Sequence, residues 1–278
     1  MSRWFGRLAE VKQEQKPMES IRHKSWNGHL IAGPCAYEGY DHACFMLDKM
    51  LPICVDSRVN LLYKTSFDKA NRTSANSFRG AENALKDFAK IKKEFGIEIC
   101  SDVHETWQIE DMDSVNVIQI PAFLCRQTPL LQAAAETGLL INVKKGQFLA
   151  PNDTKNIAQK LKDFGCKDFY LCERGTSFGY NNLVVDFRGI PIMKKYGKVC
   201  FDATHSTQLP GGCGETTGGE RQYVEPLAKT ALLWGVDALF LEVHPNPATA
   251  ISDKECQVPL SDFPDMFNRI YKVSFGIN

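Results

Sequence analysis

The sequence predicts a (β/α)₈ barrel that forms a single domain, residues 29–278, behind a short N-terminal extension, residues 1–28. Three observations point to this fold. Eight short apolar or β-branched runs begin about 30 residues apart on average, which is the length of one βα unit. Helix-like stretches separate these runs, and such alternation predicts a parallel sheet that eight units can close into a barrel. No Gly-x-Gly-x-x-Gly turn follows the first run, although an open doubly wound sheet usually has one.

The candidate strands are rich in Val, Ile, Leu and Phe, and each opens apolar and closes on polar residues. They are residues 29–34, 59–66, 97–103, 115–121, 138–145, 167–174, 198–205 and 238–244.

Helix boundary signals lie between several of these runs. A helix over 77–95 is expected to begin at Ser77 and to end before Gly96, a residue suited to the left-handed position after a helix. Residues 129–137 open with Pro129 after Thr128, and residues 154–164 and 222–234 both end before a glycine. These four segments are the predicted outer helices.

Composition excludes several classes of protein. Of the 278 residues 44% are hydrophobic, and 33 Lys and Arg balance 33 Asp and Glu, so the net charge is zero. A neutral chain lacks the basic excess of nucleic-acid-binding proteins. No apolar run approaches the ~18 residues of a membrane span, and the first residues contain no apolar signal core. We therefore expect a cytoplasmic protein with no nucleic-acid or membrane partner.

The ten cysteines include no Cys-x-x-Cys pair. Without a secretory signal we expect most of them to be reduced thiols that pack as small apolar side chains, as in the strand-like runs around Cys100, Cys172 and Cys200. Cys35 differs from these, because it follows Gly33-Pro34 at the point where the first strand should end.

Cationic side chains follow the predicted strands, at the end of the barrel where active sites lie. Convergent Lys and Arg in a neutral protein indicate an anionic ligand, and phosphate or carboxylate suits them best. The cations are Lys64, Lys69, Arg72, Arg126, Lys144 and Arg174. Asp102 closes the third strand at the same end of the barrel.

A second group at this end consists of Cys35, His205, Glu242 and Asp253. Thiolate, imidazole and carboxylate are the ligands of Zn²⁺ and Fe²⁺, and the first, seventh and eighth strands lie close together in a closed barrel. From the pattern alone, packing of Cys35 and a helix-capping role for Asp253 remain open. The glycine-rich residues 210–219, which look too rich in glycine for a packed element, are expected to form a flexible loop or a lid.

Long motifs in the chain resemble the 3-deoxy-D-manno-octulosonate-8-phosphate (KDO8P) synthases, which belong with the DAHP synthases to the phosphoenolpyruvate-condensing barrels. The resemblance covers about residues 29–270. Its motifs include Ile-Ala-Gly-Pro-Cys (31–35), Lys-Thr-Ser-Phe-Asp-Lys-Ala-Asn-Arg-Thr (64–73), Ser-Asp-Val-His-Glu (101–105), Asn-Val-Lys-Lys-Gly-Gln-Phe (142–148), Cys-Glu-Arg-Gly (172–175), Phe-Asp-Ala-Thr-His (201–205) and Glu-Val-His-Pro (242–245).

The resemblance implies that phosphoenolpyruvate condenses with D-arabinose 5-phosphate and water, a step of KDO and lipopolysaccharide biosynthesis. It assigns Lys64, Lys69, Gln119, Lys144 and Arg174 to substrate binding, chiefly of phosphoenolpyruvate. It places the pentose phosphate on Asn71, Arg72 and Thr73, and implies a homotetramer in which Arg126 reaches a neighbouring site. The catalytic candidates are Lys69, Asp102, Lys144, Arg174 and His205, and Lys144 is also a candidate proton donor near carbon 3.

The resemblance also implies a divalent metal ion such as Zn²⁺, Fe²⁺ or Mn²⁺, held by Cys35, His205, Glu242 and Asp253, because metal-independent members carry Asn in place of Cys35. One departure leaves a second substrate open. Ala36 after Cys35 is typical of DAHP synthases, which use erythrose 4-phosphate, whereas Asn71 before Arg72 favours the pentose. A catalytically silent barrel that binds phosphosugars is the alternative from another class.

Overall fold

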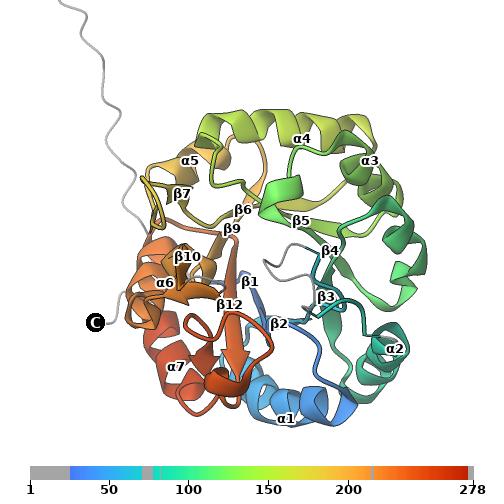
Figure 1. Ribbon diagram of the computed structural model, residues 1–278, viewed down its shortest axis with the longest axis vertical. Helices are drawn as coiled ribbons and strands as arrows, with labels where there is room; N and C mark the ends of the chain where they lie inside the picture. Colours follow the sequence, from blue (N-terminus) through green and yellow to red (C-terminus); the bar gives the residue numbers. More distant parts are fainter. Residues whose placement is uncertain (1–25, 71–77, 82, 214–215, 275–278) are drawn as a thin grey trace, which may run out of the picture.

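The computed structural model describes residues 26–70, 78–81, 83–213 and 216–274. Eight parallel strands form a closed sheet in the order β1-β2-β3-β4-β5-β6-β9-β12, and β12 pairs back with β1 (Figure 1). One strand lies inside each predicted run, so the predicted barrel is confirmed. The strands are β1 (His29–Gly33), β2 (Asn60–Lys64), β3 (Glu98–Asp102), β4 (Val117–Ile120), β5 (Leu140–Lys144), β6 (Phe169–Glu173), β9 (Lys198–Asp202) and β12 (Ala238–His244).

Helices surround the sheet and follow seven of the eight strands. After β3 the connection is instead a 3-10 helix, η1 (Thr106–Ser114). The α-helices are α1 (Tyr40–Asp56), α2 (Ala84–Phe95), α3 (Thr128–Glu136), α4 (Thr154–Asp163), α5 (Gly189–Met193), α6 (Val224–Leu233) and α7 (Phe263–Val273). The shorter 3-10 helices are η2 (Ala122–Leu124), η3 (Pro151–Asp153), η4 (His205–Thr207), η5 (Arg221–Tyr223) and η6 (Pro247–Thr249).

Three of the four predicted helices are found within two residues of their expected ends, but the helix expected to begin at Ser77 begins at Ala84. The reason is a tertiary contact. The buried carboxylate of Asp68 accepts hydrogen bonds from the backbone N–H of Gly80 (2.9 Å) and from Nε of Arg79 (3.0 Å). Gly80 has a φ of 54°, which is incompatible with a right-handed helix at that point.

The glycine-rich residues 210–219 contribute to an antiparallel hairpin of β10 (Gln208–Cys213) and β11 (Thr216–Gly219). The expectation that glycine excludes a packed element there is therefore wrong. A Cβ at Gly219 would lie 2.1 Å from Sγ of Cys256, so this glycine allows the hairpin to pack closely. Two further short pairings add β7 (Thr176–Ser177) to β8 (Leu183–Val184) and β13 (Val258–Pro259) to β12.

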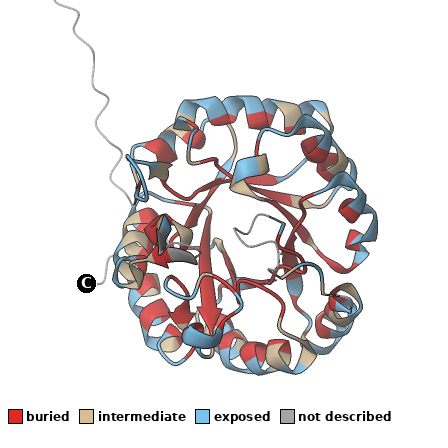
Figure 2. Cartoon of the chain, viewed as in Figure 1, coloured by how far each residue is buried: buried red, intermediate tan, exposed pale blue. Residues whose placement is uncertain are grey.

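Apolar side chains pack on both sides of the sheet. The larger core lies between the strands and the helices, whose outer faces are exposed (Figure 2). The smaller core fills the barrel and includes the predicted buried thiols. It consists of Ile31, Leu62, Cys100, Val117, Tyr170, Cys172, Cys200, Ala238 and Phe240.

The last residues of the predicted extension pack against the barrel, whereas residues 1–25 lie outside the described part of the chain. Trp26 is buried, and its indole N–H donates to the carbonyl oxygen of Val236 at 2.9 Å. None of the described helices combines the length and the apolar character that a membrane span requires.

An ion-pair cluster joins α6 to α7 and gives the fold a testable pH dependence. Arg269 donates to both carboxylate oxygens of Glu225 (2.9 and 2.8 Å), and Nζ of Lys229 lies 2.7 Å from the same carboxylate. The hydrogen bonds from Arg269 come first among the causes that lower the pKa of Glu225 from 4.5 to about 2. A carboxyl whose pKa is lower in the folded state stabilises it above the unfolded-state pKa, and this stabilisation is lost as the pH falls toward 2.

We expect Glu225→Gln to lower the free energy of unfolding at pH 7 by about 1 kcal/mol, the upper range for a partly exposed ion pair. The difference from wild type should shrink progressively below about pH 4.5. Urea denaturation of both proteins between pH 7 and pH 3 measures it. A difference of the same size at both ends of that range would contradict the assignment.

Candidate active site

A layer of polar side chains covers the apolar floor of the barrel at the C-terminal ends of the strands. Successive side chains of a strand point to opposite faces, so residues two apart share a face. Cys100 points into the barrel, and Asp102 therefore does too. The same parity places six further buried polar side chains over the floor: Lys64, Gln119, Lys144, Arg174, Asp202 and Glu242.

The four predicted metal ligands lie together on the side of β1, β9 and β12. Donor atoms of Cys35, Glu242 and Asp253 are all within 4.8 Å of one another. Sγ of Cys35 is 2.9 Å from Oδ2 of Asp253, and Nε2 of His205 is 3.4 Å from Oε1 of Glu242. Cys35, Glu242 and Asp253 thus form one compact group although up to 218 positions separate them in the chain, and His205 adjoins this group through Glu242.

The chemistry of this group fits a divalent cation. Burial, followed by the nearby carboxylates of Asp253 and Glu242, raises the pKa of the Cys35 thiol to about 12. Within the described residues, Oε2 of Glu242 is buried without a hydrogen-bond partner. A cation would relieve the crowding of carboxylates and bond the orphaned oxygen, and thiolate, imidazole and carboxylate are the donors that Zn²⁺ and Fe²⁺ prefer.

Neighbouring side chains hold the candidate ligands in place. The buried amide of Gln257 accepts a hydrogen bond from the backbone N–H of Cys35 (3.2 Å) and donates to the carbonyl oxygen of Ser252 (2.7 Å). Nδ1 of His205 lies 2.7 Å from Oδ2 of Asp202. When the hydrogen of that bond is on Nδ1, Nε2 keeps its lone pair on the side of Glu242, as metal-binding histidines require.

Two lysines at the end of β2 are linked by Asp102. Nζ of Lys64 lies 3.6 Å and Nζ of Lys69 lies 3.5 Å from the Asp102 carboxylate. Lys64 also donates to the carbonyl oxygen of Cys35 (3.1 Å) and lies 3.5 Å from Glu242. Burial opposes the charge of Lys64, but Asp102 and Glu242 outweigh it and raise its pKa. The ammonium of Lys64 is thus already bonded to protein groups, and it links the lysines around Asp102 to the candidate metal ligands Cys35 and Glu242.

Lys144 lies at the end of β5, where its ammonium is 3.2 Å from the centre of the Phe240 ring and bonds the Asp202 carboxylate. Burial disfavours the charged form of Lys144, yet Asp202 outweighs this effect and raises the pKa of the ammonium. Burial likewise opposes ionisation of Asp202, but His205 and Lys144 hold the pKa of that carboxyl well below its usual range. Both groups are therefore charged at neutral pH.

Arg174 completes the cationic wall. Its Nη2 donates to Oε1 of Gln208 at 2.6 Å, while its Nη1 is buried and has no hydrogen-bond partner among the described residues. Gln119 donates to Asp102 at 2.8 Å and accepts from Asn142 at 2.9 Å, so its amide is fixed beside the lysines. The unused guanidinium donor is suited to an incoming anion.

Comparison with known proteins shows the family of the chain. The model of the DAHP synthetase I family matches residues 16–272. The chain belongs to this family. Similar proteins named 2-dehydro-3-deoxyphosphooctonate aldolase occur in Rickettsia bellii (strain OSU 85-389), with 52% identity over 87% of this chain and 90% of the relative, and in Trichlorobacter lovleyi, with 48% identity over the same shares. A third, from Cyanothece sp. (strain PCC 7425), is 51% identical over 84% of this chain and 86% of the relative.

As a member of the DAHP synthetase I family, the chain is an enzyme that forms a carbon–carbon bond between small molecules. The predicted pentose phosphate ligands Asn71, Arg72 and Thr73 lie outside the described residues. Arg126 is exposed in the turn after η2, apart from the buried layer. These four assignments remain predictions.

Two residues of the site were missing from the candidates chosen by sequence. Asp202 bonds both Lys144 and His205. It lies two residues after the buried Cys200 and so on the same face of the strand, a signal that could have revealed it. Gln208 contacts Arg174 and Asp253, and no charge or motif in the sequence distinguishes it from other glutamines.

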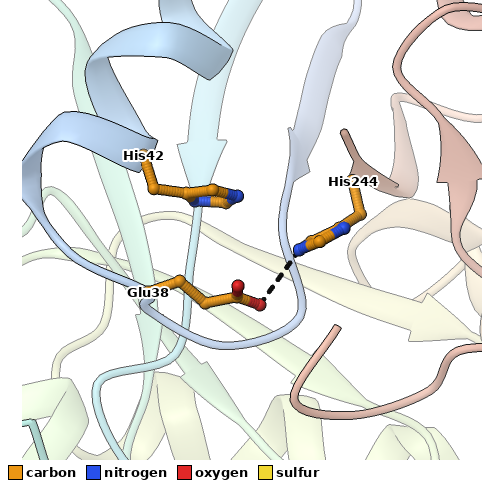
Figure 3. Close-up of side chains that lie close together, drawn as sticks. All are labelled: Glu38, His42 and His244. Atoms are coloured by element: carbon orange, nitrogen blue, oxygen red, sulfur yellow. Dashed lines mark hydrogen bonds and ion pairs between the residues drawn. The ribbon is translucent and has the colours of Figure 1, made fainter. Parts of the chain in front are cut away.

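A third group, Glu38, His42 and His244, lies between the start of α1 and the end of β12 (Figure 3). The backbone N–H of Asn246 donates to Nδ1 of His244 (3.0 Å), so the ring hydrogen of the neutral imidazole is on Nε2 and points to Glu38, 3.1 Å away. A cation at Nε2 would have to displace that hydrogen, and the positive end of α1 also disfavours a cation there. The Glu38–His244 hydrogen bond therefore links the segments after β1 and β12, whereas neither buried ring nitrogen of His42 has a hydrogen-bond partner among the described residues.

Proposed function

We propose that this enzyme condenses phosphoenolpyruvate with D-arabinose 5-phosphate and water to give 3-deoxy-D-manno-octulosonate 8-phosphate and phosphate, and that it depends on a divalent metal ion. One observation carries the proposal: the cations Lys69, Lys144 and Arg174 share a single barrel mouth with the donor atoms of Cys35, Glu242 and Asp253. Two phosphorylated reactants require such cations, and an aldehyde acceptor benefits from an adjacent Lewis acid.

Lys144 and Arg174 are suited to the phosphate and carboxylate of phosphoenolpyruvate. Arg174 offers a buried guanidinium donor with no partner among the described residues, and Lys144 offers an ammonium that Asp202 keeps charged. A raised pKa makes an ammonium a poor proton donor at neutral pH, so it favours anion binding by Lys144 over proton transfer near carbon 3. Lys69, oriented by Asp102, adds a third positive charge.

In the proposed reaction carbon 3 of the enol attacks the aldehyde carbon of the pentose, water adds at carbon 2, and phosphate leaves by cleavage of the carbon–oxygen bond. Residues Asn71, Arg72 and Thr73 would hold the pentose phosphate. Cys35, His205, Glu242 and Asp253 would hold the metal ion, which when bound can orient or polarise the aldehyde or activate water. Burial of the layer excludes bulk water, which strengthens each of these charge interactions.

Turnover with two aldose phosphates tests the substrate assignment. We expect phosphate release only when phosphoenolpyruvate and arabinose 5-phosphate are both present, and loss of turnover on exhaustive chelation. Faster turnover with erythrose 4-phosphate would assign the chain a DAHP synthase reaction instead. Binding of both ligands without turnover under any divalent metal would support a silent phosphosugar-binding barrel. Activity that survives exhaustive chelation would remove the metal requirement.

We also propose a cytoplasmic homotetramer in which the exposed Arg126 reaches the site of a neighbouring copy. Light scattering gives the mass of the assembly, and a mass of one or two chains would contradict the tetramer.

A further inference from the structure

Gln208 forms a bridge between the two halves of the site. At the start of β10, its buried side chain accepts a hydrogen bond from Nη2 of Arg174 at 2.6 Å and donates one from Nε2 to Oδ1 of Asp253 at 2.8 Å. A guanidinium can only donate and an ionised carboxylate can only accept, so these partners fix which end of the amide carries the oxygen. The amide thus joins Arg174 to Asp253 through two hydrogen bonds, beside the path in which Asp202 joins Lys144 to His205.

We infer that Gln208 is a positioning residue that couples binding of the metal ion to binding of phosphoenolpyruvate. The inference rests on the proposed function, because it takes Arg174 as an anion-binding group and Asp253 as a metal ligand. It adds that the two are not independent, since one buried amide sets the position of both side chains.

The sign of the coupling follows from the polarity of the bridge. The guanidinium of Arg174 polarises the amide, so Nε2 draws electron density from the Asp253 carboxylate and weakens it as a ligand. An anion on Arg174 offsets that pull, and the carboxylate then binds a cation more strongly. By thermodynamic reciprocity, a cation on Asp253 must strengthen anion binding at Arg174 by the same factor.

Substitution at position 208 separates this role from general support of the fold. Met has a similar length but neither accepts from Arg174 nor donates to Asp253 effectively. Glu still accepts from Arg174 but has no N–H for Asp253 when ionised, so it breaks the path at one end only. If Gln208 only supported the fold, its substitution would weaken the binding of both ligands without changing the factor by which one ligand affects the affinity for the other.

The experiment titrates the full chain with Co²⁺, after removal of bound metal and in the oligomeric state in which it is purified. Absorption from the bond between the Cys35 thiolate and cobalt reports binding. The titration is carried out with and without saturating phosphoenolpyruvate. In wild type we expect phosphoenolpyruvate to tighten Co²⁺ binding by about 10-fold, within the usual range of coupling between sites. In Gln208→Met and in Gln208→Glu we expect a factor below about 3, because only direct attraction between the two ligands and the contacts of Asp202 with Lys144 and His205 remain. Gln132→Met, which changes an exposed amide on α3, should keep the wild-type factor.

The outcomes separate the inference from the proposal beneath it. If wild type fails to bind Co²⁺ at all, both the metal site and the coupling are wrong. If wild type binds both ligands but the two Gln208 variants keep its coupling factor, the metal site stands and the inference alone is overturned. If Gln208→Met does not fold, as circular dichroism would show, Gln208→Glu decides between the two results.

Discussion

Replacing Lys144 by Met is expected to lower kcat by about 10³-fold, the loss typical of removing one preorganised donor from a buried site. The ammonium lies over the ring of Phe240 and bonds Asp202, which keeps it charged and fixed before any substrate arrives. Met retains most of the length and apolar stem of the side chain but cannot bind phosphate or carboxylate. Steady-state kinetics with both proposed substrates measures the effect.

The stability of this variant gives an independent check. Asp202 keeps its contact with His205 when Lys144 is lost, so its carboxylate is not left entirely unpaired. We expect the variant to fold and to unfold cooperatively in urea, at a lower midpoint than wild type. Lys195→Met, on the exposed surface after α5, should retain wild-type kcat. A Lys144 variant within about tenfold of wild type would show that this cation is not part of the reacting site.

The strands were predictable because their pattern is local. In seven of the eight strands the inward-facing row changes from apolar to polar toward the C-terminal end, as from Cys100 to Asp102, and that change is visible in the sequence. The start of α2 was not predictable in the same way. Ser77 carries a standard helix-start signal, yet Asp68 binds Arg79 and Gly80 in another conformation, and that contact depends on the fold.

The site shows the same limit. Charged and thiol side chains at strand ends could be chosen by chemistry alone, as Cys35 and Arg174 were. Gln208 could not, because a neutral amide is informative only when the positions of both its partners are known. The carboxylate of Asp202 lies between these cases, since strand parity predicts its direction but not its two partners, Lys144 and His205.

Replacing Cys35 by Ala is expected to weaken binding of a divalent metal by more than about 100-fold, since even residues that only support a metal ligand contribute about 10–100-fold. The thiol is buried among the carboxylates of Glu242 and Asp253, where it supplies the one soft donor of the group. Competition for Zn²⁺ with a chromophoric chelator measures the affinity. Cys54→Ala, which truncates an equally buried thiol in α1, should leave the affinity unchanged while it lowers stability.

Cys35→Asn distinguishes a metal ligand from a packing residue. An amide at this position can donate to Asp253, which the thiol now contacts, and so can hold that carboxylate without a cation. We therefore expect Cys35→Asn to bind Zn²⁺ weakly, yet to keep more chelator-resistant activity than Cys35→Ala. A packing role predicts a different order, in which both variants lose stability but bind Zn²⁺ like wild type. Wild-type affinity in Cys35→Ala would remove the thiol from the metal site and leave three donors, His205, Glu242 and Asp253, to hold the ion.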